Sequence, residues 1–167
     1  MNAIVAVCQD WGIGNEGRLL VPNKADMRSF VAHTTGGTVV MGRTTLEGFP
    51  HARPLKNRRN IVLSSREGYE VEGAEVVRSI PEALAAIAHD DPKRVWVIGG
   101  ARVYAELLPC CARAYVTKNA CTLPADAFFP NLDEDPAWEL ERTEGSGTTA
   151  EGVGYEFCVY RNLDVRA

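Results

Sequence analysis

Short runs of apolar and β-branched residues recur along the chain, with segments of helical character between them. The runs that we interpret as strands cover residues 3–7, 38–41, 61–63, 76–77, 95–98 and 114–117. Strands that are buried on both faces form continuous apolar runs, and their alternation with helices is typical of parallel sheets. The pattern therefore predicts an α/β fold with a central, mostly parallel sheet and helices on both faces.

The last part of the chain follows a different pattern. Residues 138–141 and 155–160 alternate polar and apolar side chains, as half-exposed strands do, and a stretch rich in glycine and threonine, 145–154, separates them. This arrangement predicts an antiparallel hairpin that closes one edge of the sheet.

A helix over residues 80–88 has a well-defined start. Ser79 and Glu82 have the spacing of a capping box, and Pro81 lies in the first turn. The chain contains no internal repeat and no stretch with the composition of a linker. Its 167 residues, of which 46% are apolar, suffice for one well-packed core but not comfortably for two. We therefore expect a single domain over residues 1–167.

The net charge of −4 comes from acidic and basic residues that are interspersed along the chain. Such a distribution offers no electrostatic footprint for nucleic acid or for an anionic membrane, so it favours chemistry on small molecules. No basic leader precedes the first apolar run, and no later apolar stretch approaches the length of a membrane span. We expect a cytoplasmic protein.

The cysteines are an odd set of five without the spacing of a zinc site: Cys8, Cys110, Cys111, Cys121 and Cys158. We expect reduced thiols, although adjacent Cys110 and Cys111 leave open a strained vicinal disulfide. The three histidines are isolated from one another and from acids at ligand spacing, so we predict no metal site.

Asp26 is the acid whose position most needs an explanation, because it lies with Met27 and Phe30 on the face of a short predicted helix that we expect to be buried. A carboxylate in such surroundings must be neutralised by a proton, paired with another group, or used in binding or catalysis. A suitable partner is a flat nitrogen heterocycle, whose adjacent N–H groups meet both carboxylate oxygens at once.

Three strand ends offer groups that could bind phosphates. Residues 95–104 run from a buried strand through Gly99 and Gly100 directly into a helix, residues 39–45 end in a glycine, an arginine and two threonines, and residues 61–66 end in Ser64, Ser65 and Arg66. Ligands of open α/β sheets collect at this edge, and a cation in place of the usual ribose-binding acid favours NADP over NAD. Each segment alone also fits a tight turn, a capped helix or a solvated loop.

Taken together, these residues resemble the dihydrofolate reductase family, in order and spacing along nearly the whole chain. The motifs that carry the resemblance are Gly12-Ile13-Gly14, Asp26 with Phe30, Met41-Gly42-Arg43-Thr44-Thr45, Arg53-Pro54-Leu55-Lys56-Asn57-Arg58, Leu63-Ser64-Ser65, Ile98 to Tyr104, Thr117, and Asp126 with Phe128-Phe129-Pro130. The resemblance implies the reduction of 7,8-dihydrofolate to 5,6,7,8-tetrahydrofolate, with hydride transfer from NADPH to the pterin C6 and protonation at N5.

On the substrate side, the resemblance implies that Asp26 holds the pterin and promotes protonation of N5. Arg58 would bind the α-carboxylate of the glutamate tail, a task suited to a planar, permanently charged fork; without the resemblance, a solvated cation would be preferred. Thr117 would hydrogen-bond Asp26. The remaining pocket residues would be Val5, Ala6, Met27, Phe30, Leu55, Ile98 and Tyr104.

On the cofactor side, the resemblance implies a cis peptide between Gly99 and Gly100 and contacts with NADPH along the three strand ends. The cofactor-binding residues would be Ala6, Ile13, Gly42, Arg43, Thr44, Thr45, Leu63, Ser64, Ser65, Arg66, Arg78, Gly99, Gly100, Ala101, Arg102, Val103 and Tyr104. The resemblance also implies a monomer, and binding of diamino-heterocycle antifolates through the same carboxylate.

The chain departs from the family in the segment before the acid-bearing helix. Val21 stands where family members usually carry a tryptophan, so an indole N–H that helps to fix an active-site water is absent, and the lid with Leu19 near its tip must pack differently. Two alternatives remain at this point: a reductase of the same fold acting on another pterin or an aminouracil, and a non-catalytic module that binds pterin or NADP.

Overall fold

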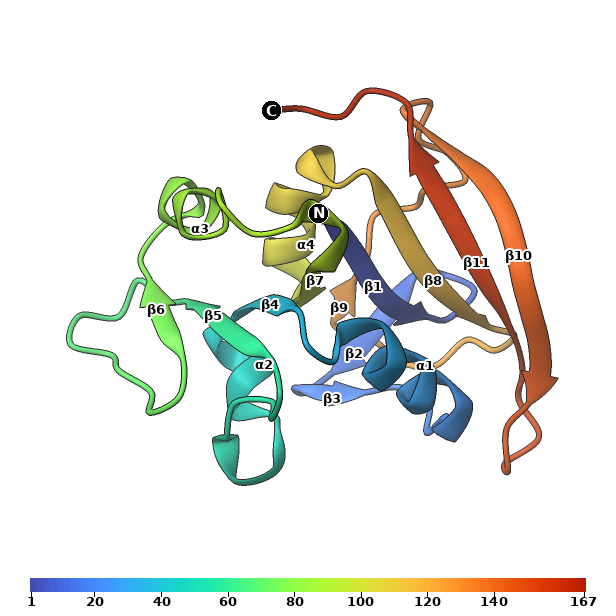
Figure 1. Ribbon diagram of the computed structural model, residues 1–167. Coiled ribbons are helices and arrows are strands. Elements are labelled where there is room, and N and C mark those ends of the chain that lie inside the picture. The colour runs from blue at the N-terminus through green and yellow to red at the C-terminus, as the bar shows by residue number, and fades with distance from the viewer.

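The structure, a computed structural model, describes residues 1–167 and is built around one eight-stranded sheet (Figure 1). The strand order is β10-β11-β8-β1-β7-β4-β5-β6. The strands are β1 (Asn2–Val7), β4 (Thr38–Gly42), β5 (Arg59–Leu63), β6 (Glu75–Val77), β7 (Val95–Gly99), β8 (Arg113–Asn119), β10 (Trp138–Thr148) and β11 (Gly154–Asn162).

The central strands of this sheet pair in parallel from β8 through β1, β7, β4 and β5 to β6. Only β11 runs against the other strands of this sheet, and it pairs antiparallel with both β8 and β10. The β10–β11 hairpin forms the edge drawn in orange and red in Figure 1. The predicted α/β class, with a mostly parallel sheet and an antiparallel hairpin at one edge, is confirmed.

Four α-helices connect or flank the strands, and none is long and apolar enough to cross a membrane. They are α1 (Lys24–Thr34), α2 (Arg43–Glu47), α3 (Ile80–Ala86) and α4 (Ala101–Leu107), with single 3₁₀ turns η1 (Pro50–Ala52), η2 (Pro92–Arg94) and η3 (Leu108–Cys110).

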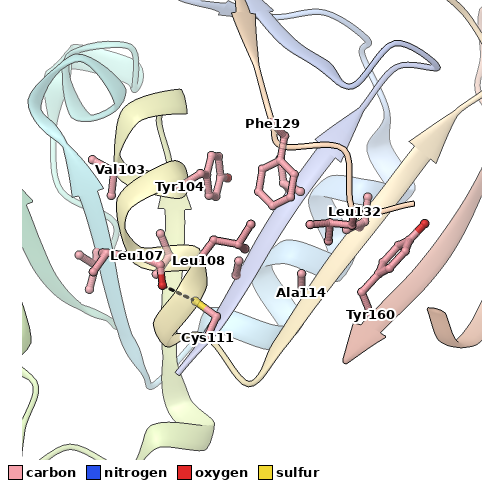
Figure 2. Packing of buried hydrophobic residues seen from close by; sticks show 14 of the residues in the cluster. Val103, Tyr104, Leu107, Leu108, Cys111, Ala114, Phe129, Leu132 and Tyr160 are labelled. Atoms are coloured by element: carbon pink, nitrogen blue, oxygen red, sulfur yellow. Dashed lines mark hydrogen bonds between the residues drawn. The ribbon is translucent and has the colours of Figure 1, made fainter. Parts of the chain in front are cut away.

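Two apolar clusters show that helices cover both faces of the sheet. On one face, alternate side chains of the strands pack against α3 and α4 and against the segment that follows β9 (Ala127–Phe128). Figure 2 shows α4 of this cluster beside Phe129, whose ring lies edge-on to Tyr104 at 4.9 Å between centroids. Full burial of one such large apolar side chain stabilises the fold by about 1.5–3 kcal/mol.

The opposite face of the sheet carries the intervening residues of the same strands. Val39, Met41 and Trp96 pack there against Leu46 of α2, and Phe30 of α1 lies at the edge of the cluster. The alternation follows from the period of two in a β-strand, because successive side chains point to opposite faces.

The edge hairpin is longer than its sequence pattern indicates. Residues 145–148, which we expected in the connection, continue β10, so only residues 149–153 join the two strands. Gly147 pairs with Tyr155, and the ring of Tyr155 lies over the glycine, where a Cβ would meet the phenol oxygen at 2.5 Å. An aromatic ring across the ladder compensates for the missing side chain, so glycines fit the strand.

The helix expected over 80–88 begins where predicted but ends at Ala86. Ser79 Oγ accepts a hydrogen bond from the Glu82 amide at 3.3 Å. The Glu82 carboxylate accepts from the amide of Arg78 rather than from that of Ser79, so only half of the capping box forms.

A second, small sheet was not predicted. It contains β2 (Gly12–Asn15), β3 (Arg18–Leu19) and β9, in the order β3-β2-β9. Strands of two to four residues that are rich in glycine carry no measurable periodicity, which is why the sequence pattern did not reveal them. This small sheet is reached through a tight turn after β1, in which the buried Trp11 has a positive φ of 64°.

Candidate active site

The strands β1, β4, β5 and β7 end at the same edge of the large sheet, and a cleft of about 1610 Å³ opens there. This is the edge at which open α/β sheets bind ligands. The small sheet borders the same cleft, with Ile13 and Leu19 among its lining residues. A cavity of this size is large enough for a dinucleotide and a second, smaller molecule together, since drug-sized ligands occupy about 300–1,000 Å³.

Nearly all the residues predicted for the two binding sites line this cleft. The candidates for the substrate side that do so are Val5, Ala6, Asp26, Met27, Phe30, Leu55, Ile98 and Tyr104. The candidates for the cofactor side that do so, besides Ala6 and Tyr104, are Ile13, Gly42, Arg43, Thr44, Thr45, Leu63, Ser64, Ser65, Arg66, Arg78, Gly99, Gly100, Ala101, Arg102 and Val103. Thr117 and Arg58 do not line it: Thr117 contacts Asp26, and Arg58 lies beside Phe30.

The first turn of α1 fixes Asp26. The side chain of Asn23 caps the helix by accepting a hydrogen bond from the Asp26 amide at 3.0 Å. The hydroxyl of Thr117, on β8, donates to Asp26 Oδ1 at 2.6 Å. Lys24 is exposed at the helix start, and no cation forms an ion pair with Asp26. The carboxylate is therefore held in place with the capacity to accept further hydrogen bonds from a ligand.

Burial raises the pKa of Asp26 above its ordinary value, and the hydrogen bond from Thr117 lowers it in part. The helix face around Asp26 differs from the buried face that we predicted, because Met27 is 49% exposed. This face of α1 borders the open cleft rather than the closed core, so Met27 remains exposed while Phe30 is partly buried against the apolar cluster of the sheet.

Tyr104 closes the inner wall of the cleft. Its hydroxyl donates a hydrogen bond of 2.7 Å to the carbonyl of Ile4, and the side chain is buried. Burial raises the pKa of Tyr104 well above its ordinary value, so the phenol stays protonated. We conclude that the Tyr104 ring positions ligands by its shape, while its hydroxyl proton stays in the hydrogen bond to the β1 backbone.

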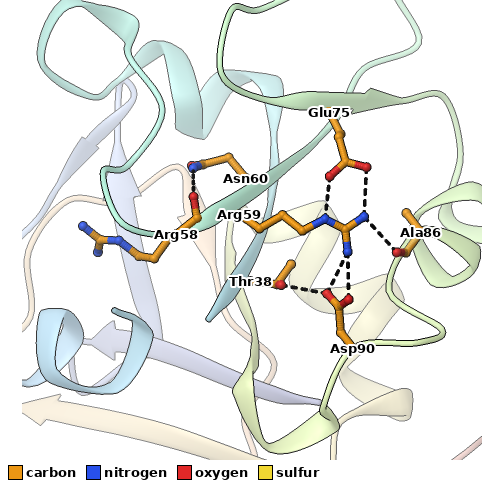
Figure 3. Close-up of polar contacts among 7 residues, drawn as sticks. All are labelled: Thr38, Arg58, Arg59, Asn60, Glu75, Ala86 and Asp90. Atoms are coloured by element: carbon orange, nitrogen blue, oxygen red, sulfur yellow. Dashed lines mark hydrogen bonds and ion pairs between the residues drawn. The ribbon is translucent and has the colours of Figure 1, made fainter. Parts of the chain in front are cut away.

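Two adjacent arginines have opposite environments (Figure 3). The guanidinium of Arg59 is saturated by acids, with paired hydrogen bonds to Glu75 and Asp90 and a further bond to the carbonyl of Ala86. The guanidinium of Arg58 points to the other side, and Arg58 has no carboxylate partner.

Arg58 instead donates to the hydroxyl of Thr34 at 3.0 Å and to the carbonyl of Lys56 at 2.9 Å. Its charged carbon lies 6.0 Å from the centre of the Phe30 ring. Partial burial lowers the pKa of Arg58 somewhat, as expected for a cation without a counter-charge. The arrangement leaves a fixed positive charge at the Phe30 end of the cleft, which suits a ligand carboxylate.

The glycines at the end of β7 allow a ligand to approach the backbone closely. The peptide between Gly99 and Gly100 is cis, and Gly99 has a φ of +128°, a conformation that side chains disfavour. A Cβ on Gly100 would lie 3.4 Å from Thr45 Oγ1. The following helix, α4, has no side-chain cap, so its first backbone N–H groups are available to a ligand. The surface around this turn fits a phosphate group.

Cations surround the same part of the cleft. Arg43 and Arg102 form ion pairs with glutamates one turn later, Arg43 with Glu47 at 2.7 Å and Arg102 with Glu106 at 2.6 Å. These contacts are exposed or half-exposed, and exposed pairs contribute only about 0–1 kcal/mol, so a bound phosphate can displace them. Arg78 donates to the carbonyls of Ser64 and Arg66, which holds its guanidinium beside the end of β5.

The sequence pattern missed several residues of the cleft. Phe49 and Pro50 extend the apolar wall after α2, and Gly17 and Arg18 contribute from the turn and strand of the small sheet. Phe49 could have been recognised from the sequence, because a large aromatic residue outside the predicted strands and helices needs other apolar side chains to pack against. The residues of the small sheet had no such feature. Val21, at the unusual position, is half-buried and does not line the cleft.

Comparison with known proteins gives a consistent result. A model of the family described as "Dihydrofolate reductase" matches residues 1–162. The chain is 36% identical over 160 residues to a dihydrofolate reductase of Neisseria gonorrhoeae, covering 94% of this chain and 95% of the relative. It is 41% identical over 136 residues to that of Mycobacterium tuberculosis, covering 79% of this chain and 80% of the relative.

Among solved structures, a dihydrofolate reductase from Enterococcus faecalis, complexed with NADP(H) and the compound RAB-propyl, superimposes with a TM-score of 0.86. The two chains are 36% identical, and the match covers 98% of this chain and 96% of the other.

Proposed function

The chain belongs to the dihydrofolate reductase family, and from this premise we propose that the cleft holds dihydrofolate between Asp26 and Arg58, beside NADPH. The protein is an NADPH-dependent oxidoreductase that reduces 7,8-dihydrofolate to 5,6,7,8-tetrahydrofolate. The observation that carries the assignment of residues is the half-buried Asp26 carboxylate, which accepts a hydrogen bond from Thr117 and pairs with no cation.

Asp26 is the catalytic residue in this proposal. One carboxylate oxygen takes the Thr117 hydroxyl, and the carboxylate can accept N–H bonds from N3 and the 2-amino group of the pterin. NADPH supplies the hydride when bound, and the reduced ring also requires a proton at N5. The raised pKa of Asp26 keeps a larger fraction of the group protonated near neutral pH than an exposed aspartate would have.

In this proposal the small sheet (β2, β3 and β9) acts as a lid, and its residues Ile13 and Leu19, which line the cleft, would help to exclude water. Val21 carries no hydrogen-bond donor, so the usual indole contact to an active-site water is absent. We propose that protonation of N5 depends on Asp26 and on water that this carboxylate orients. Thr117 would influence both through its hydrogen bond to Asp26, which holds the carboxylate and lowers its pKa.

Arg58 binds the α-carboxylate of the substrate's glutamate tail in this proposal. Its guanidinium has no acidic partner, whereas the neighbouring guanidinium of Arg59 is fully committed to Glu75 and Asp90. The benzoyl group of the substrate would lie between Phe30 and Leu55, both of which line the cleft. Apolar walls and a single charge at the far end match the shape of this substrate.

NADPH fits the remaining length of the cleft. The glycine turn after β7 would receive the pyrophosphate through backbone N–H groups, and Ala6, Ile13 and Tyr104 would surround the nicotinamide. The 2′-phosphate would meet Arg43 and the hydroxyls of Ser64 and Thr44, which line the cleft at the ends of β4 and β5. A cation and hydroxyls at this place favour NADPH over NADH.

We further propose that the whole chain acts as one domain and as a monomer in the cytoplasm. The eight-stranded sheet includes both the first strand, β1, and the last, β11, and residues from Ile4 to Ala127 line one cleft. All five cysteines are free thiols, as is usual in a reducing compartment. The dispersed charge and net value of −4 offer no surface for nucleic acid or for an anionic membrane.

The test follows the absorbance of reduced nicotinamide with dihydrofolate, comparing NADPH with NADH. Asp26→Asn should lower turnover by about 10²–10⁴-fold, the usual contribution of a general acid. The matched control is Asp164→Asn, an exposed acid near the C-terminus, which should leave turnover unchanged. Undiminished turnover in Asp26→Asn would refute the catalytic role of Asp26.

The same assay separates the alternatives. Tight binding of NADPH and dihydrofolate without oxidation of the cofactor would indicate a non-catalytic module, and oxidation only with an aminouracil substrate would indicate a different reductase. Diaminopyrimidine antifolates should compete with dihydrofolate, because their protonated ring pairs with the Asp26 carboxylate. Inhibition that persists undiminished in Asp26→Ala would contradict this mode of binding.

A further inference from the structure

Two cysteines that the reaction does not use lie in contact at the base of the small sheet. The Sγ atoms of Cys8 and Cys121 are 3.7 Å apart, although the residues are 113 positions apart in the chain. Cys8 directly follows β1, and Cys121 lies between β8 and β9. The amide of Gln9 donates to the carbonyl of Cys121 at 2.9 Å, so the two backbone segments are also joined.

The geometry brings this pair close to a covalent bond. A disulfide has an S–S distance of about 2.05 Å, so the sulfurs at 3.7 Å must approach by roughly 1.7 Å, which small side-chain rotations and loop adjustments supply. The other thiols are not placed this way: Cys111 is buried and donates to the carbonyl of Leu107, and Cys158 is buried on β11.

We propose that Cys8 and Cys121 form a reversible disulfide when the protein meets a hydroperoxide, making this pair a redox modification site at the base of the lid. Cys121 is partly exposed, whereas Cys8 is only 2% exposed, so the oxidant reaches Cys121 first.

The chemistry proceeds in two balanced steps. Cys121 is oxidised to a sulfenic acid, and the hydroperoxide is reduced to the corresponding alcohol, or to water if it is hydrogen peroxide. The sulfur of Cys8 then attacks the sulfur of Cys121, the S–S bond forms as the S–O bond breaks, and the departing hydroxide takes the Cys8 proton and leaves as water. A thiol reductant reverses the reaction by thiol–disulfide exchange.

Burial, followed by the contact with Cys121, raises the pKa of Cys8 to about 12. Cys8 therefore remains a thiol at neutral pH, which protects it from direct oxidation and makes the second step slow.

The disulfide would restrain the small sheet. Three residues separate Cys8 from β2, and the segment after Cys121 leads to β9, which pairs with β2 through Gly12 and Phe128. The bond would thus tie together the two chain segments that enter this sheet, which carries Ile13 and Leu19 to the cleft. Lid opening often limits turnover, so we expect slower turnover in the oxidised enzyme; this consequence rests on the proposed function of the cleft.

The experiment treats the purified full-length protein with hydrogen peroxide, alkylates the remaining thiols in denaturant and measures intact and peptide masses. We expect a loss of two hydrogen atoms and a linked pair of peptides that contain Cys8 and Cys121. Cys121→Ser should abolish the link, and Cys8→Ser should leave a Cys121 sulfenic acid that dimedone traps. Cys110→Ser is the matched control and should still form the link, because Cys110 lies outside the pair.

Other results would overturn the proposal. A link between Cys110 and Cys111, an intermolecular link, or no link after prolonged exposure would each contradict the assignment of the pair. The second measurement compares turnover before oxidation, after it and after addition of dithiothreitol. Turnover of the wild type should fall several-fold and recover with the reductant, whereas Cys8→Ser should keep its activity. A disulfide that forms without changing turnover would refute the effect on the lid, independently of whether Asp26 is the catalytic residue.

Discussion

The hydroxyl of Thr117 donates a hydrogen bond of 2.6 Å to Oδ1 of Asp26, and this contact joins β8 to α1 across 91 positions of the chain. It opposes the effect of burial on the pKa of the carboxyl group, because it stabilises the ionised form. The same side chain thus helps to hold the acid in place and moderates the pKa that burial raises.

Replacing Thr117 by valine should shift the pH dependence of the reaction upward. Thr117→Val removes the donor, so burial raises the pKa of Asp26 further, and the rate of hydride transfer should decline at a higher pH than in the wild type. Stopped-flow measurement of this rate against pH tests the prediction. Thr117→Ser, which keeps a hydroxyl, serves as the control, and a midpoint that moves downward in Thr117→Val would contradict the prediction.

The raised pKa of Asp26 also predicts how stability depends on pH. The folded protein binds a proton at Asp26 more tightly than the unfolded chain, whose carboxyl group titrates near 3.8. The ionised group therefore costs stability above that pH, and the cost grows until the pH passes the raised value of the folded state.

Asp26→Asn removes this cost. Relative to the wild type, the variant should become progressively more stable as the pH rises from about 3 through the raised pKa of Asp26, and the difference should then level off. Urea denaturation of both proteins at a series of pH values measures the difference. A difference that shrinks with rising pH would mean that the pKa of Asp26 is lowered rather than raised.

Arg58 and Arg59 should differ in the consequence of their loss. Arg58→Ala would remove the charge-assisted contact that we propose to the substrate, a kind of contact worth about 1.5–3 kcal/mol, so the affinity for dihydrofolate should fall by roughly 10- to 150-fold with little change in stability. Arg59→Ala should keep this affinity and should lower the free energy of unfolding by about 1 kcal/mol, since it breaks partly exposed ion pairs.

Fluorescence titration with dihydrofolate and urea denaturation of both variants separate the two effects. The adjacent positions make each variant the control for the other. Equal losses of affinity in both would show that the distinction between their guanidinium environments has no bearing on substrate binding.

Arg43 should govern the choice of cofactor. In Arg43→Ala, the KM for NADPH should rise by about 10-fold or more, because a charged contact to the 2′-phosphate is lost, while the KM for NADH should change little. Steady-state kinetics with both cofactors measure the ratio. Arg102→Ala offers a comparison: it should weaken both cofactors alike if its partner is the shared pyrophosphate, and a parallel loss in Arg43→Ala would contradict the role of Arg43.

Gly100→Ala tests the phosphate cradle. The added methyl group lies 3.4 Å from Thr45 Oγ1, an ordinary contact, so the fold should tolerate it. Gly100 and Thr45 both line the cleft, so the methyl group would occupy space at the turn where we propose that the pyrophosphate approaches the backbone, and NADPH affinity should fall by at least 10-fold. Thermal denaturation without ligand and calorimetric titration with NADPH measure the two properties, and unaltered NADPH affinity would exclude this turn from the cofactor site.

Several features of the protein followed from the sequence by itself. Apolar runs such as 95–98 identified the parallel strands, because a strand buried on both faces needs apolar residues throughout. Ser79 marked the start of α3, since a capping hydroxyl acts within one turn. The glycines and hydroxyl-bearing residues that follow these strands could be recognised from the sequence for the same reason, because their interpretation as a ligand-binding turn depends on residues close in the chain.

Other features required the tertiary structure. The small sheet around Ile13 forms through pairing with Ala127 and Phe128, more than a hundred residues away, and its short strands have no periodicity of their own. The opposite environments of Arg58 and Arg59 could not be read from two adjacent arginines, because the partners of Arg59 come from β6, the last residue of α3 and the turn after that helix.

Asp26 shows where the division lies. The sequence determined that an acid lies among apolar residues on a helix, and therefore that this carboxyl group requires a binding partner or a function. The family resemblance already implied the hydrogen bond from Thr117, and the structure contains it. Only the tertiary structure decided that this face of α1 borders an open cleft and that no cation neutralises the acid. Patterns along the chain report local preferences, whereas burial, charge pairing and proton affinity depend on which distant segments the fold brings together.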